Sequence, residues 1–128
     1  CGALNFYQVG VAQALVDVTS LKGCTVLGAS AGAGLAVLLH GGLEPLSIVR
    51  RMLQLLSNTV GPARWLAPGG VQQVGEAFTD EFVTEDLHTI VSNRVCLSIT
   101  QLRPFKNHRV TTFANRQDLC DALRAANN

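Results

Sequence analysis

The sequence predicts an α/β fold, and three of its features carry that prediction. In residues 25–39 a short apolar run of β type meets a glycine-rich turn and continues as small and aliphatic residues of helical character. In residues 94–102 apolar and polar side chains alternate, which is typical of a strand. Helical periodicity covers most of the remaining chain. We therefore expect helices packed against a sheet.

Composition limits the size of the domain and the kinds of partner. The chain has 128 residues, of which 48% are hydrophobic and 15% charged, and its formal net charge is +1. That length suits one domain or part of one. The low charged fraction excludes disorder and predicts an apolar face that a partner or further chain covers. The basic residues are scattered except for one cluster, and we expect no nucleic-acid partner; the cluster is Arg103, Lys106, His108 and Arg109.

No stretch approaches the roughly 18 apolar residues that a membrane-spanning helix needs. The four cysteines lie far apart and form no C-x-x-C pair, which argues against a zinc site or a redox motif. We expect reduced thiols in an intracellular protein, no metal and no cofactor. Three of the cysteines fall in apolar stretches and are predicted to be buried: Cys24, Cys96 and Cys120.

The first half of the chain predicts a helix, a strand and a second helix. The first helix opens near Asn5, which is a competent N-cap, and covers residues 6–18. A strand follows over residues 24–28, and a buried helix over residues 31–39. His40 and the glycines after it end that helix, where a histidine cation is favourable at the negative end of the dipole.

The middle of the chain predicts further helices around one loop. A helix begins at Glu44-Pro45, with Arg50 and Arg51 facing outward and a core stripe of Leu46, Val49, Leu53 and Leu56. Residues 58–70 form the loop, whose Trp65 and Leu66 either touch a membrane or substrate mouth or attach the loop to the core. Residues 71–82 and 84–91 are helical, with Thr84 as N-cap of the second. Their acidic side chains predict a solvated face: Glu76, Asp80, Glu81, Glu85 and Asp86.

The last third predicts a hairpin and a helix. The strand over residues 94–102 turns at residues 104–107 and returns over residues 109–113. Asn115 then caps a helix over residues 117–126, whose Leu119, Ala122 and Leu123 face inward.

Ser30 stands at the corner between the strand and the buried helix, with Gly28 two residues before it and Gly32 two residues after it. At such a corner the serine is held in strained backbone angles with its side chain exposed, and the glycines remove Cβ atoms that would collide. The N–H of Ala31 and the positive end of the helix then point toward an oxyanion beside Ser30. The pattern predicts a nucleophile elbow. The alternative is a tight turn, glycine-rich for packing alone, with Ser30 as helix N-cap.

Four blocks of the sequence resemble the patatin-like phospholipase domain family, and they are most similar to its adipose triglyceride lipase branch. The blocks follow the family's order over nearly the whole chain: Cys1-Gly2 with residues 6–11, the corner at residues 28–33, the strand at residues 97–102, and residues 113–119 running into residues 122–125. The resemblance implies a partial three-layer α/β/α domain with a central, mostly parallel sheet. Residues 1–128 would then lack the first strand and the C-terminal part of the domain.

The resemblance also implies a Ser–Asp dyad that acts on lipid acyl esters, of the triacylglycerol lipase or phospholipase A type, through an acyl-serine intermediate. Ser30 matches the nucleophile. Cys1 and Gly2 match the end of a glycine-rich loop whose backbone N–H groups, with that of Ala31, form the oxyanion hole. Asn5 stands where the family has the last glycine of that loop.

The family's dyad aspartate lies in an Asp-Gly motif, and no aspartate of this chain precedes a glycine. We therefore expect a fragment that stops before that residue and is inactive alone. His40, His88 and His108 are expected to be ordinary surface histidines rather than bases for Ser30. The implied partners are a lipid acyl ester and the surface of a membrane or lipid droplet, with a cytoplasmic or peripheral location. The alternative is a non-catalytic lipid-binding or interaction segment of a truncated paralogue.

Overall fold

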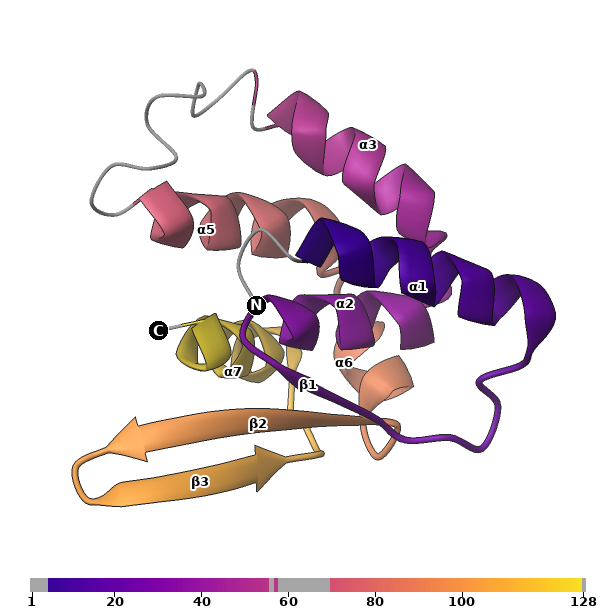
Figure 1. The fold of residues 1–128 in the computed structure, drawn as a ribbon. Helices are drawn as coiled ribbons and strands as arrows, with labels where there is room; N and C mark the ends of the chain where they lie inside the picture. Colours follow the sequence, from indigo (N-terminus) through magenta and orange to yellow (C-terminus); the bar gives the residue numbers. More distant parts are fainter. Residues whose placement is uncertain (1–4, 56, 58–69, 128) are drawn as a thin grey trace.

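The structure is a computed structural model that describes residues 5–55, 57 and 70–127 (Figure 1). Its elements follow in the order α1 (Asn5–Val18), β1 (Val26–Ala29), α2 (Ala31–His40), α3 (Pro45–Leu55), α5 (Gly70–Phe82), α6 (Leu87–Val91), β2 (Val95–Leu102), β3 (Phe105–Val110) and α7 (Arg116–Asn127). The predicted α/β class is confirmed.

The sheet has the strand order β1-β2-β3. β1 pairs with β2 in parallel from Val26↔Val95 to Ala29↔Ser98, and β2 pairs with β3 antiparallel. The sheet is therefore mixed rather than mostly parallel. Because β1 and β2 run in the same direction, their carboxyl ends lie at one edge of the sheet, and the β2–β3 turn projects from that edge.

The helices form two layers on one side of the sheet (Figure 1). α2 and α7 contact the strands, whereas α1 packs on α2 and α3, and α5 packs on α7. The core lies between the sheet and the inner helices, and it includes Val37, Leu97, Leu119 and Leu123. Among the described residues no helix covers the other sheet face, so this part of the chain does not form the expected third layer.

The C-terminal helix agrees with the sequence-based prediction. Leu119, Ala122 and Leu123 are buried. The Asn115 Oδ1 accepts a hydrogen bond of 2.9 Å from the backbone N–H of Asp118, as expected of an N-cap. This cap fixes the start of α7 against β2.

The predicted core stripe of α3 is wrong at Leu46 and Leu53, while Val49 is half-buried. Leu46 and Leu53 are 42% and 51% exposed, whereas Pro45 and Ile48 are buried. Leu56 lies outside the described residues. α3 packs on α1 and α2 and does not contact the sheet closely, so the neighbouring helices decide which side is buried. Arg50 and Arg51 are exposed, as predicted.

Three boundaries also differ. β1 covers Val26–Ala29 rather than residues 24–28, because the Cys24 N–H donates to the Leu21 carbonyl in the turn before the strand. α6 begins at Leu87, and the cap position is Asp86 rather than Thr84, because residues 84–86 form a turn in which the Leu87 N–H donates to the Thr84 carbonyl. β3 begins at Phe105 rather than at residue 109, because the Leu102↔Phe105 pair extends the ladder to a two-residue turn.

Cys24 is exposed, which corrects the prediction that it is buried, while Cys96 and Cys120 are buried. Cys24 precedes β1 and therefore lies outside the sheet. Trp65 and Leu66 fall outside the described residues. None of the helices in the described ranges has the length and apolar character needed to cross a membrane.

Candidate functional site at the end of β1

Ser30 occupies the single position between the last residue of β1 and the first residue of α2. Its backbone angles are φ 52° and ψ −137°, in a region that residues with a side chain rarely adopt. Such a conformation costs about 1–3 kcal/mol and persists only where the surroundings impose it. The Ser30 carbonyl accepts a hydrogen bond of 2.8 Å from the Ala33 N–H, but the side chain makes no capping hydrogen bond. The hydroxyl therefore does not cap α2.

Gly28 is required by the close approach of β1 to α2. A Cβ atom at Gly28 would lie 2.4 Å from the carbonyl oxygen of Gly32 and 2.7 Å from the Cα of Ala33. At Gly32 the nearest atom to such a Cβ is the Gln8 Oε1, at 3.6 Å, which is an ordinary contact. The predicted collision thus exists at Gly28 and not at Gly32.

A pocket of about 580 Å³ opens beside Ser30. We call it the Ser30 pocket, and its lining residues are Ala29, Ser30, Ser98, Ile99, Thr100, Leu102, Ala125 and Ala126. β1 ends opposite Ser98, while β2 continues to Leu102. The last residues of β2 therefore have no strand beside them on the β1 side, and the end of α7 closes the other side of this gap. Ligands of α/β proteins commonly bind at the carboxyl ends of parallel strands, and the volume lies within the roughly 300–1,000 Å³ of small-molecule sites.

Polar groups lie on one wall of the Ser30 pocket, and Asn107 on β3 holds them. Its Nδ2 donates to the Ser98 Oγ at 2.9 Å and lies 3.4 Å from the Thr100 Oγ1. The other lining side chains are apolar or alanine, apart from Ser30 itself. The pocket therefore combines a polar wall on β2 with an otherwise apolar lining beside Ser30.

The described residues that line this pocket include no acid and no histidine. The Asp118 Oδ2 accepts a hydrogen bond of 2.9 Å from the Ala114 N–H. The His108 Nε2 is 3.0 Å from the Gln101 Oε1, and the His88 Nδ1 is 2.7 Å from the Glu85 carbonyl. Each of these side chains is engaged locally, and none lines the pocket.

His40 differs from the expected surface histidine. It lies at the far end of α2, and its Nε2 is buried without a hydrogen-bond partner among the described residues. Burial, and next the nearby Arg94 cation, lower the pKa of His40 below 6.5. The neutral form is therefore favoured here, in contrast to the cation expected at a helix C-terminus.

Ala31 begins α2, so its N–H has no acceptor within the helix and lies at the positive end of the dipole. Cys1 and Gly2, the other predicted oxyanion donors, lie outside the described residues. Within the described ranges no three His, Cys, Asp or Glu side chains are arranged to hold a metal ion.

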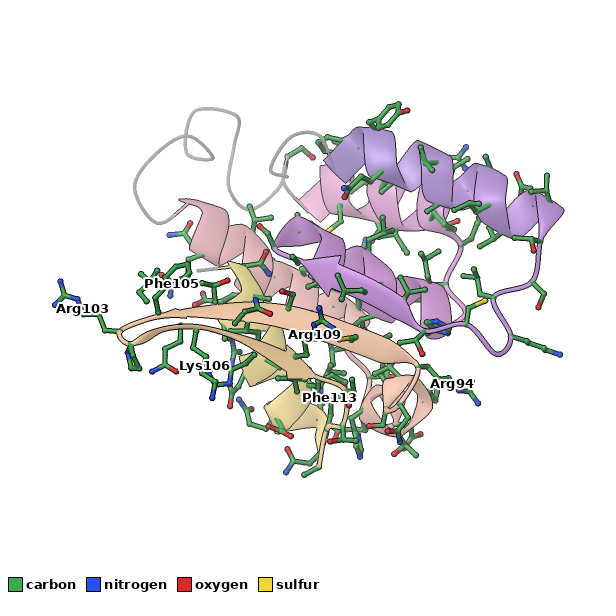
Figure 2. All side chains as sticks on the ribbon, turned by 60° about the horizontal axis from the view of Figure 1, so that its bottom comes forward. Arg94, Arg103, Phe105, Lys106, Arg109 and Phe113 are labelled. Carbon is green, nitrogen blue, oxygen red and sulfur yellow. The ribbon has the colours of Figure 1, made fainter. Side chains whose placement is uncertain are left out.

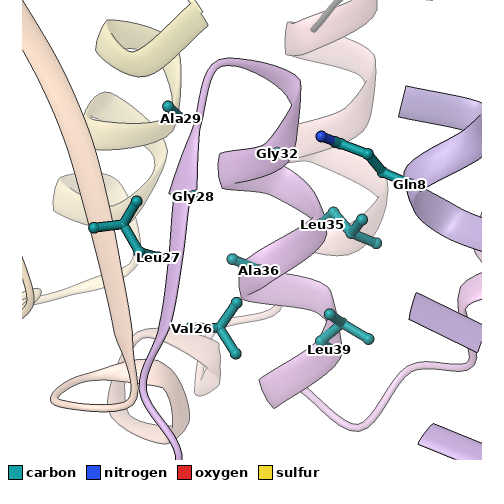
Figure 3. Close-up of a pocket in the computed structure, with 9 residues that line it drawn as sticks. All are labelled: Gln8, Val26, Leu27, Gly28, Ala29, Gly32, Leu35, Ala36 and Leu39. Atoms are coloured by element: carbon teal, nitrogen blue, oxygen red, sulfur yellow. The ribbon is translucent and has the colours of Figure 1, made fainter. Parts of the chain in front are cut away.

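A second pocket, of about 300 Å³, lies along β1 and α2, with Gln8 as its one lining residue from α1 (Figure 3). Among the described residues no strand pairs with this edge of β1. We call it the edge pocket, and it is lined by Gln8, Val26, Leu27, Gly28, Ala29, Gly32, Leu35, Ala36 and Leu39. Neither pocket was predicted from the sequence. The Ser30 pocket depends on how far β2 extends beyond β1, and the edge pocket depends on which side of β1 has no neighbouring strand. The sequence signal was only that the second strand is longer than the first.

Comparison with known proteins finds relatives along nearly the whole chain. The human omega-hydroxyceramide transacylase is 28% identical over 130 residues, which cover 95% of this chain and 24% of the relative. The human patatin-like phospholipase domain-containing protein 4 is 27% identical over 134 residues, covering 98% and 52%. A mouse 1-acylglycerol-3-phosphate O-acyltransferase is 30% identical over 132 residues, covering 96% and 31%. No protein-family model and no solved structure matches the chain.

The aligned regions include the four motif blocks and also the segments between them. The chain spans from about a quarter to about a half of the length of these relatives. The chain is thus a distant homologue, over nearly its whole length, of the patatin-like phospholipase domain proteins in the branch of adipose triglyceride lipase.

Proposed function

We propose that this chain carries the nucleophile of a lipid acyl hydrolase, that Ser30 is that nucleophile, and that the corner at residues 28–32 is a nucleophile elbow. The observation that carries the proposal is the conformation of Ser30. It combines a positive φ with a hydroxyl that makes no capping bond, at the head of a pocket with largely apolar walls. A serine that served only to cap α2 would use its side chain for that purpose.

The chemistry follows from this placement. The Ser30 Oγ attacks the carbonyl carbon of an acyl ester while a base takes the hydroxyl proton. The tetrahedral oxyanion is stabilised by the Ala31 N–H and by the N–H groups of the loop that includes Cys1 and Gly2. The ester C–O bond then breaks, and the leaving alcohol receives the proton from the base. Water attacks the resulting acyl-serine in the same way and releases a fatty acid.

The base is the part of the proposal that the described lining of the Ser30 pocket does not supply. No described acid lines the Ser30 pocket, and the resemblance places the dyad aspartate in an Asp-Gly motif that residues 1–128 lack. The relatives are two to four times as long as the matched segment, which is consistent with a base from further chain. We also propose that a first strand and a further layer, outside residues 1–128, complete a three-layer domain.

The names of two relatives favour a second outcome for the acyl-serine. They are a transacylase and an O-acyltransferase, so an alcohol of a second lipid could replace water as the acceptor. The first half of the reaction at Ser30 is the same in both cases. Product analysis with and without an added acceptor alcohol separates hydrolysis from transfer.

The test replaces Ser30 in the longest form of the protein. Ser30→Ala should abolish hydrolysis of a nitrophenyl ester while the circular dichroism spectrum stays unchanged, because the substitution removes one oxygen atom. Ser47→Ala is the matched control, since Ser47 is an exposed serine on α3 that bonds to Glu44. Turnover that survives Ser30→Ala would place the nucleophile elsewhere and would favour the non-catalytic alternative for this segment.

A further inference from the structure

The tip of the β2–β3 hairpin exposes two large apolar side chains at the end of the sheet. Leu102 is 75% exposed and Phe105 is 82% exposed. They are direct cross-strand partners that flank the Arg103-Pro104 turn, so they form one apolar patch. Figure 2 shows Arg103 and Phe105 at the outer end of the hairpin, away from the helices.

The hairpin also lies in the most one-sided charge distribution of the chain. Residues 87–117 contain five of the ten Lys and Arg residues and none of the nine acids: Arg94, Arg103, Lys106, Arg109 and Arg116. Arg116 is engaged, since its Nε donates to the Val83 carbonyl at 2.7 Å. Arg103, Lys106 and Arg109 form no ion pair with an acid among the described residues. Arg103 and Lys106 thus flank the apolar tip without an acidic partner among the described residues, and Arg109 lies further along β3 (Figure 2).

The hairpin tip lies at the same end of the sheet as Ser30. β1 and β2 are parallel, so Ser30 at the end of β1 and the turn at the end of β2 lie at the same edge of the sheet. Leu102 belongs to both features, because it is half of the exposed pair and also lines the Ser30 pocket. The pocket and the tip are therefore continuous.

We propose that the hairpin tip, residues 102–106, binds the surface of an anionic lipid membrane. Leu102 and Phe105 enter the interfacial region, and Arg103 and Lys106 contact the phosphate groups, with Arg109 further along β3. A small apolar anchor alone binds membranes only marginally, and stable binding needs a second signal such as basic residues. Each cation near an anionic surface strengthens binding about fivefold. An exposed apolar pair beside these cations fits an anionic lipid surface. A purely acidic macromolecule would bind the cations but would not bury Leu102 and Phe105.

Membrane binding by the tip brings the Ser30 pocket to the interface, with Leu102 at the boundary between the two. A lipid acyl chain then enters the pocket without crossing water. The proposal does not depend on Ser30 as nucleophile, because the binding surface is on β2 and β3. Ser30→Ala should therefore leave vesicle binding unchanged, and this separates a failure of the catalytic proposal from a failure of this one.

The experiment is vesicle flotation with phosphatidylcholine vesicles, with and without phosphatidylserine. Flotation separates bound protein from any aggregate, because aggregates sediment. The wild-type protein should float with the anionic vesicles, and less so as salt is raised. Leu102→Ser with Phe105→Ser should weaken binding about tenfold or more. Arg103→Gln with Lys106→Gln should weaken it by about 25-fold and remove the preference for phosphatidylserine.

Matched controls use the other end of the molecule. Val18→Ser removes an apolar side chain that is 81% exposed, and Lys22→Gln removes an exposed cation near it. Both should bind like the wild type. The proposal is overturned if the wild type does not float, if the hairpin variants float as well as the wild type, or if only the cation variants lose binding, since that last result describes a general electrostatic patch.

Discussion

At the scale of the residue, the site depends on a few atoms around Ser30 and Gly28. Local sequence predicted the corner because a short strand, a glycine, a serine and a helix-compatible run follow one another within a few residues. It did not show which glycine is sterically required, because that depends on the distance between β1 and α2. The structure assigns the requirement to Gly28, where a Cβ would meet the backbone of Gly32 and Ala33.

The two glycines should therefore respond differently to alanine. Gly28→Ala forces β1 and α2 apart and should lower the free energy of unfolding by about 1–3 kcal/mol. Gly32→Ala adds a good helix former with an ordinary contact to Gln8 and should raise it by up to about 1 kcal/mol. Urea unfolding followed by circular dichroism measures both changes. Equal losses for the two variants would contradict the described approach of β1 to α2.

His40 gives a prediction for the dependence of stability on pH. Burial and Arg94 hold the pKa of His40 below the value of 6.5 expected for a free histidine, so the unfolded chain binds this proton more tightly than the folded one. The contribution of neutral His40 to the free energy of unfolding is fully present above pH 6.5. It is lost as the pH falls from there through the lower pKa of His40 in the folded state.

His40→Gln should remove this contribution to the acid sensitivity, so that the urea midpoint changes less between pH about 7.5 and about 5.5 than in the wild type. Arg94→Gln removes the second cause of the shift and should give an intermediate change. The same loss of stability in wild type and His40→Gln would show that other groups account for the acid sensitivity.

At the scale of the element, the sequence predicted the ranges of those helices and strands that are determined by residues close in sequence. The helices α1, α2, α5 and α7 and the strand β2 lie close to their predicted ranges, because apolar periodicity and caps such as Asn115 act within a few residues. The predicted buried side of α3 was wrong because it depends on packing against α1, which is distant in sequence. The predicted start of β3 was wrong because Leu102 pairs with Phe105 across a two-residue turn, and the alternation of side chains does not show how close to the turn the pairing begins. The Ser30 pocket has the same origin, since it exists only because β2 extends beyond β1.

At the scale of the whole molecule, the sheet shows where the chain and the family expectation differ. Helices cover one face of the sheet (Figure 1). Leu27, Leu102 and Phe105 are exposed, and the strand register places all three on one face, because Leu27 pairs with Cys96 and Leu102 with Phe105. The low charged fraction predicted an apolar face of this kind, but composition does not say where it lies. The edge pocket beside β1 is a second uncovered apolar surface. That further chain covers the surface along β1, and that residues 1–128 are inactive alone, stay predictions.

The central claim is that Ser30 becomes covalently modified during the reaction. The most direct measurement treats the longest form of the protein with an alkyl fluorophosphonate and locates the adduct by peptide mass spectrometry. We expect one adduct, on the Ser30 Oγ, that Ser30→Ala removes and Ser47→Ala does not. An adduct on another serine, or modification of Ser30 that persists at the same rate in denatured protein, would contradict it.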